Sequence, residues 1–279
     1  MGTPKILISN DDGIAAYGLR ALAESLGAIG ELWIVAPDRE RSAISHAISL
    51  HVPLRVRQSA EREYAVDGTP TDCIYLALHH LMDGPPALVI SGINHGPNLG
   101  NDVLYSGTVS AAMEGALFGH PALAVSLGLR DNRQGPLQQS DFAVAADVAA
   151  KLATAILDRP MQPGVLLNVN VPATPREAIR GIKLCRLGYT DWADAVTVRQ
   201  DPRGRPYYWI GGDRRGQDEI KDSDNNGIAD GYVTVTPIHY DVTDYRSFAY
   251  ARSLGIPGLE KADDGLGDDP LPYPVHPRA

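Results

Sequence analysis

The chain has 279 residues, 44% hydrophobic and 21% charged, so it is long enough to bury a sizeable core as one large domain. Its formal net charge of −9 argues against general nucleic-acid binding, and we expect no nucleic-acid duplex as a partner. No apolar run approaches the ~20 residues of a membrane span, and the N-terminal residues enter a strand pattern at once, so the sequence predicts no membrane contact and a cytoplasmic location.

The first half of the chain alternates strand patterns with helix patterns. Residues 6–8 are apolar and partly β-branched, and leucines recur at helical spacing over 15–26. Further strands are predicted at 32–36, 87–91 and 121–127, with a short one beginning at Tyr64, and further helices at 71–82 and 106–119. This alternation predicts an α/β fold with a parallel sheet and helices on both faces.

The second half departs from that alternation. A strongly apolar helix is predicted at 141–157 and a strand at 164–171. Residues 182–212 alternate around the turn sequence "DPRGRP", which predicts a long β-hairpin. A polar loop then leads into the strand "GYVTVTPI". The stretch from Leu254 onward is rich in Gly, Pro and Asp and is expected to be either irregular or an arm that docks elsewhere.

Polar residues gather where the predicted parallel strands end. Asn10, Asp11 and Asp12 end the first strand, residues 38–42 follow the second, and residues 91–98 follow "ALVI". Ligands of open parallel sheets bind outside the carboxyl ends of the strands, so these three loops can face one crevice.

Asp11 and Asp12 are adjacent, and neighbours within a strand point to opposite faces. The two carboxylates can serve one site only if the backbone turns there, which Gly13 makes easy. Together with a hydroxyl and a carboxamide they form an all-oxygen set suited to Mg²⁺, Mn²⁺ or Ca²⁺. Zinc is disfavoured because Cys73 and Cys185 lack ligand spacing and no histidine cluster is present. The alternative is that one aspartate caps the helix and the other is solvated.

The stretch "NDVLYSGTVSAAMEGA" places small hydroxyl residues and a glycine at the start of a helix. Such a helix start offers donors and the positive end of the helix dipole, which suit a phosphate. The alternative is that Ser106 and Thr108 only cap the helix. A metal beside an anion pocket indicates phosphoryl chemistry.

The blocks "ILISNDDGI", "VAPDRERSA", "VDGTPTDC", "VISGINHGPNLG", "YSGTVSAAMEGA" and "GYVTVTPI", in this order over about residues 4–245, resemble the stationary-phase survival protein SurE family. These proteins are metal-dependent phosphatases that act mainly on nucleoside 5′-monophosphates. The resemblance implies a 5′-nucleotidase, with 3′-nucleotides as further substrates. It also implies a three-layer Rossmann-like domain over 1–254 with a projecting hairpin arm, followed by a tail over 255–279.

The resemblance also implies residue roles. One divalent ion per subunit is bound by Asp11, Asp12, Ser42 and Asn94, and the two aspartates are catalytic. The substrate phosphate lies among Asn98, Ser106, Gly107 and Thr108. The family forms homodimers or homotetramers with exchanged C-terminal segments, although the stretch after Tyr250 does not align with it. We expect a second subunit to bury the arm residues Tyr207, Tyr208 and Trp209.

Several alternatives stay open at this point. "DSDNNGIAD" imitates a calcium loop, but Val233 stands where a bidentate glutamate is needed, so a polar loop is favoured. Neither His46 nor His95 is assigned a proton-transfer role, because geometry must come first. Attack by water is preferred over an aspartyl-phosphate at Asp11. The competing function is a non-catalytic, metal-dependent nucleotide-binding or regulatory module.

Overall fold

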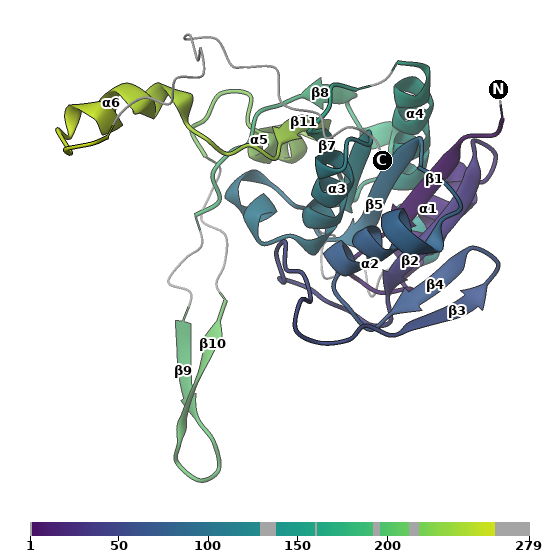
Figure 1. Cartoon of the computed structure of the whole chain (residues 1–279), viewed down its shortest axis with the longest axis horizontal. Coiled ribbons are helices and arrows are strands. Elements are labelled where there is room, and N and C mark those ends of the chain that lie inside the picture. The colour runs from purple at the N-terminus through teal and green to yellow at the C-terminus, as the bar shows by residue number, and fades with distance from the viewer. Residues whose placement is uncertain (1, 129–137, 160, 192–195, 212–217, 260–279) are drawn as a thin grey trace.

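The computed structural model describes residues 2–128, 138–159, 161–191, 196–211 and 218–259. Within them one sheet runs through the molecule in the order β3-β4-β2-β1-β5-β6-β7-β11-β8 (Figure 1). Its strands are β1 (Lys5–Ser9), β2 (Glu31–Pro37), β3 (Val56–Ala60), β4 (Glu63–Val66), β5 (Leu88–His95), β6 (Ala122–Leu127), β7 (Val165–Val171), β8 (Ile182–Leu184) and β11 (Val233–His239). The strands from β4 to β7 are mutually parallel, as the sequence predicts.

Helices cover both faces of this sheet because its strands are apolar on both sides. One face packs against α1 (Tyr17–Leu26) and α4 (Ala143–Asp158), with Ile6 and Ile8 among the buried residues. The other packs against α2 (Pro70–Leu76) and α3 (Gly107–Leu117), with Leu7 in its core. The result is the predicted three-layer α/β fold.

The order of the strands reverses at β1. The chain passes from β1 to β2 on one side and reaches β5 on the other, so β1 lies between them with Ser9 paired to Ser91. In open α/β sheets the crevice at such a switch point is the usual ligand site. The turn with Asp11 and Asp12 follows β1, and the loop with Asn98 follows β5, so both leave the sheet at this point.

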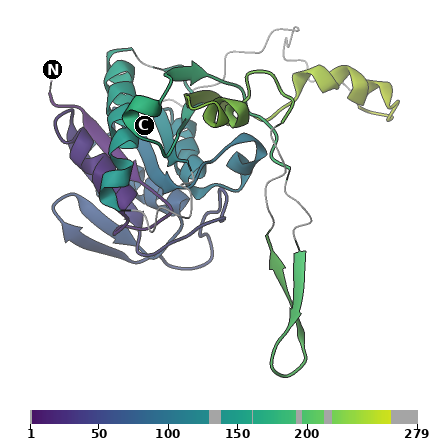
Figure 2. The same cartoon turned by 180° about the vertical axis from the view of Figure 1, so that it is seen from behind.

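The arm is shorter than predicted. Ile182–Leu184 pairs in parallel with β11 and belongs to the main sheet, so the predicted start at residue 182 is wrong. The arm consists of β9 (Val196–Gln200) and β10 (Pro206–Ile210), and it projects away from the sheet in both views (Figures 1 and 2). The side chains of Tyr208 and Trp209 are each 63% exposed, so they do not pack on their own core.

Three further details differ from expectation. The polar loop predicted before β11 contains a short helix, α5 (Asp224–Ala229), because the Ser223 hydroxyl accepts a hydrogen bond from the N–H of Asn226 and caps it. An antiparallel edge strand, β3, was not foreseen. The predicted tail, 255–279, follows α6 (Phe248–Ser253), and residues 260–279 lie outside the described part of the chain.

A search of the described helices for one of sufficient length and apolarity to cross a membrane finds none.

Contact between α1 and β5 yields a stability prediction. A Cβ on Gly18 would lie 2.0 Å from the carbonyl oxygen of Ile93, so Gly18→Ala must displace backbone. We expect Gly18→Ala to lower the free energy of unfolding by about 1–3 kcal/mol in urea titrations. Gly27→Ala, at the end of the same helix, is the control. Its Cβ would meet nothing closer than 3.6 Å and its φ is −59°, so it should be neutral or slightly stabilising.

Candidate functional site

The turn after β1 takes the two aspartates out of strand geometry. The Asn10 side chain bonds both ways with Gly13, accepting from its N–H at 3.2 Å and donating to its carbonyl at 3.0 Å. Gly13 adopts a φ of +97°, which glycine tolerates best. Asp11 is buried and Asp12 half-buried, and both lie at the carboxyl edge of the sheet as predicted.

Asp11 packs against the start of α3. The Thr108 hydroxyl donates a short hydrogen bond to its carboxylate. A Cβ on Gly107 would come within 2.8 Å of Asp11 Oδ2, so only glycine allows this approach. The structure therefore brings together Asp11, Gly107 and Thr108. Ser106 is the N-cap of α3, its hydroxyl accepting from the N–H of Val109 at 3.0 Å.

Asp12 lies against the end of β5, the strand that carries Asn94. The N–H of His95 donates to Asp12 Oδ2 at 3.2 Å, which joins the β1 turn to the neighbouring strand. Asn94 donates its amide N–H to the Gly96 carbonyl at 2.8 Å, and this orients its side chain.

Ser42 lies beside this turn, but its hydroxyl is directed elsewhere. The N–H of Arg41 donates to the Asp11 carbonyl at 2.7 Å, which ties the loop after β2 to the turn. The exposed Ser42 donates to Glu40 Oε1 at 2.7 Å. Of the four predicted metal ligands, Ser42 is the one whose side chain donates a hydrogen bond to a carboxylate.

Asn98 is buried in an amide network that sequence reasoning missed. Its N–H donates to Asn170 Oδ1 at 2.8 Å, and its carbonyl accepts from the side chains of Asn168 and Asn170 at 2.8 and 2.9 Å. Its own amide donates to the Ser126 hydroxyl at 2.8 Å. Its hydrogen bonds thus run to β6 and β7. The available signal was "LLNVNVP", where two asparagines alternate in an otherwise apolar strand and so share one face.

The two histidines near the site play different parts. His46 lies 2.7 Å from the buried carboxylate of Glu114 on α3, and His95 contributes its backbone N–H to Asp12. Within the described residues, neither imidazole ring forms a hydrogen bond with Asp11 or Asp12.

Burial and nearby negative charge raise the pKa of both aspartates. Burial raises the pKa of Asp11 from 3.8 to about 6, against the lowering effect of the Thr108 hydroxyl and with a further rise from the charge of Asp12. Burial also raises the pKa of Asp12, opposed by the His95 N–H and assisted by the charge of Glu40. Nearby protein groups therefore do not neutralise these carboxylates fully.

These residues fit a hard divalent ion. Two carboxylates at one turn, with the Asn94 amide on the neighbouring β5 and the Ser42 hydroxyl in the loop after β2, form an oxygen-only donor set. Asp11 Oδ2 faces the glycine at the start of α3, where a larger side chain would fill the space. Over the described ranges, no group of three or more His, Cys, Asp or Glu side chains is placed to hold a metal ion, so the two aspartates would need the amide and hydroxyl oxygens as further ligands.

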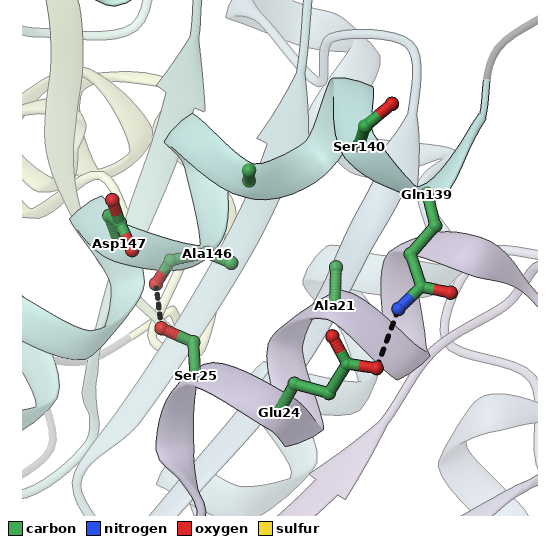
Figure 3. A pocket seen from close by; sticks show the side chains of 8 residues that line it. Ala21, Glu24, Ser25, Gln139, Ser140, Ala146 and Asp147 are labelled. Atoms are coloured by element: carbon green, nitrogen blue, oxygen red, sulfur yellow. Dashed lines mark hydrogen bonds between the residues drawn. The ribbon is translucent and has the colours of Figure 1, made fainter.

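A separate groove lies between α1 and the helical turn before α4 (Figure 3). Its polar groups bond to one another: Gln139 donates to Glu24 at 2.7 Å and Ser25 donates to the Ala146 carbonyl at 3.2 Å. It contains none of the predicted site residues, so it is not the candidate site.

Fold and site together define a Rossmann-like α/β protein with an acidic turn and a capped helix start at its switch point. The profile of the family described as "Survival protein SurE" matches residues 6–194. The chain therefore belongs to the survival protein SurE family.

Individual relatives agree with this assignment. The chain is 52% identical over 260 residues to a curated 5′-nucleotidase SurE of Anaeromyxobacter dehalogenans (strain 2CP-C), covering 92% of this chain and 98% of that protein. It is 51% identical over 243 residues to the 5′-nucleotidase SurE of Myxococcus xanthus, covering 86% and 89%. The crystal structure of the SurE protein from Aquifex aeolicus matches with a TM-score of 0.79 and 38% identity, covering 91% of this chain and 100% of that one.

The pKa of Asp11 generates a prediction about stability and pH. Its folded-state pKa lies above the unfolded value, so the metal-free native state loses stability as pH rises from about 4 through 6. A shift from 3.8 to about 6 corresponds to roughly 3 kcal/mol. Asp11→Asn keeps the shape and an acceptor for Thr108 and removes this penalty. With EDTA, we expect it to be more stable than wild type by about 1–3 kcal/mol at pH ~7.5, and nearly equal at pH ~4.

Urea unfolding of both proteins at the two pH values measures this difference. If the variant unfolds more readily at the higher pH, Asp11 is a structural acceptor and the interpretation is wrong.

Proposed function

We propose that this protein is a 5′-nucleotidase that hydrolyses nucleoside 5′-monophosphates to nucleoside and inorganic phosphate with one bound divalent ion per subunit. The observation that carries the proposal is 52% identity over 98% of the length of a curated 5′-nucleotidase. The crowded aspartates against the start of α3 support it, since they combine a cation-binding set with a helix start suited to a phosphate.

In this proposal Asp11, Asp12, Asn94 and Ser42 hold the ion. When bound, such an ion polarises phosphoryl oxygens and lowers the pKa of a water ligand. Ser42 must give up its hydrogen bond to Glu40 to serve as a ligand. The raised pKa of Asp11 means that a proton and the ion compete for its carboxylate.

In the same proposal, the substrate phosphate binds at the first residues of α3. Helix N-termini present free N–H groups and a positive dipole end, and Gly107 lets a ligand approach the backbone. The Ser106 hydroxyl caps the start of the helix, while the Thr108 hydroxyl donates to Asp11 Oδ1 and orients that carboxylate. Asn98 completes the pocket with its second amide hydrogen, because the first is donated to Ser126. These contacts hold and orient the phosphoryl group for in-line attack by water.

A substrate panel tests the function. We expect inorganic phosphate to be released from the four 5′-mononucleotides with Mg²⁺ or Mn²⁺, abolished by EDTA and restored by added metal. Nucleoside 3′-monophosphates and ribose 5-phosphate in the same panel define the breadth of the substrate class. Asp11→Asn should lower the rate at least about a hundredfold and remove the rise in melting temperature that metal produces.

Glu24→Gln, in the groove of Figure 3, is the matched control and should behave as wild type. Full activity of the EDTA-treated protein would contradict the metal-dependent mechanism. Nucleotide binding with metal but no release of phosphate would favour the non-catalytic module.

We further propose that a second subunit covers the arm. Its strands carry apolar side chains on both faces: Val198 pairs with Tyr208 on one, and Trp209 lies on the other with Tyr207. An isolated two-stranded hairpin with these side chains in water has marginal stability at best.

A cytoplasmic location stays a prediction of the sequence.

Light scattering at micromolar concentration tests the assembly. We expect a dimer or tetramer, and we expect the double variant Tyr208→Ser, Trp209→Ser to shift it toward smaller species because it removes buried aromatic area. A wild-type protein that is monomeric under these conditions would rule the proposal out.

A further inference from the structure

Asp224 is a fully buried carboxylate outside the predicted site. It is the first residue of α5 and accepts three backbone N–H groups. Gly100 donates to its Oδ2 at 3.0 Å, Gly188 donates to Oδ1 at 2.8 Å, and Asn225 donates to Oδ1 at 2.9 Å. A buried carboxylate whose oxygens accept hydrogen bonds from backbone N–H groups fixes the segments that supply those donors.

These donors come from two segments far apart in the sequence. Gly100 lies two residues after Asn98, in the loop that follows β5. Gly188 lies between β8 and the arm. The two segments meet again one step further along, where the N–H of Thr190 donates to Asn101 Oδ1 at 2.6 Å. A Cβ on Gly100 would lie 2.8 Å from the Gly188 carbonyl oxygen, so the backbones are in direct contact.

The loop over 98–101 is therefore held at both ends, with the Asn101–Thr190 contact beside the second of them. At one end the side chain of Asn170 bonds to both the N–H and the carbonyl of Asn98. At the other end, Asp224 holds the N–H of Gly100, whose φ of +52° follows an extended Leu99. Asn168 and Ser126 also bond to Asn98, so this end of the loop is held by β6 and β7, and Asp224 restrains the end that those strands do not reach.

We infer that Asp224 is a positioning residue for the phosphate pocket: it fixes the loop over 98–101, and so the amide of Asn98, and joins this loop to the root of the arm. This inference rests on the proposed function, and within it on the role of Asn98. A carboxylate is required because all three partners are donors. An asparagine in its place would direct an N–H toward one of them.

Asp224→Asn tests the inference through KM rather than through stability. We expect KM for a 5′-mononucleotide, and the inhibition constant of inorganic phosphate, to rise together by about tenfold, the effect of losing one hydrogen bond to a charged group. The Mn²⁺ concentration that gives half-maximal thermal stabilisation should stay unchanged, because the aspartate turn is intact. A purely structural role would lower the active fraction, and with it kcat, but not these two constants.

Asp218→Asn is the matched control. Asp218 lies in the same cluster and accepts from the N–H of Tyr189 at 3.0 Å and from the side chain of Asn225 at 2.8 Å, but it has no hydrogen bond to the loop over 98–101. We expect it to lower the melting temperature and to leave KM and phosphate inhibition within about twofold of wild type.

Asn101→Ala is a second route to the same outcome, since it loosens the loop at the Thr190 contact without altering α5. It should raise both constants in the same direction, so the inference can be tested even if Asp224→Asn does not fold. Unchanged constants in Asn101→Ala, or in a folded Asp224→Asn, with wild type active, would overturn it. An inactive wild type would instead count against the proposed function.

Discussion

The structure of the site depends on one constraint, the burial of Asp11 beside Asp12 at the switch point of the sheet. Two adjacent carboxylates repel, and burial strengthens that repulsion. The chain holds them there through the Asn10–Gly13 turn, the start of α3 and the Arg41 N–H. A penalty of roughly 3 kcal/mol is a large part of the 5–15 kcal/mol that stabilises a typical domain, so the surrounding core must offset it. The apolar layers on both faces of β1 and β5 provide that stability.

Local sequence was sufficient to predict the parts of the site that local chemistry determines. Asp11 and Asp12 are neighbours followed by a glycine, so their turn could be foreseen, as could the cap at Ser106. Asn98 was placed near the phosphate only by resemblance. Its actual partners, Asn168 and Asn170, are 70 and 72 residues away in the chain. No periodicity encodes which buried amides will meet across that distance, so the network required the structure.

The same distinction explains two of the differences between the predicted and the observed fold. Alternation over residues 182–184 is typical of any half-exposed strand, and only pairing with β11 assigns it to the main sheet. Polar residues over 222–230 suit a loop or a short capped helix equally well. The tertiary hydrogen bonds of Asp224 to Gly100 and Gly188 select the helix, because they fix its first residue. In both cases a short segment takes its structure from a partner distant in sequence.

Comparison of the buried carboxylates separates structural roles from functional ones. Asp72 receives the N–H groups of Ser49 and Thr69 and the Ser49 hydroxyl, and Asp224 receives three N–H groups, although burial still raises the pKa of Asp224. Asp11 accepts a hydrogen bond from the Thr108 hydroxyl, and burial still raises its pKa to about 6. A buried acid whose donors fall short needs either a proton or a cation. Since Asp12 lies beside it with its own pKa raised, a divalent cation relieves both at once, whereas a proton relieves only one.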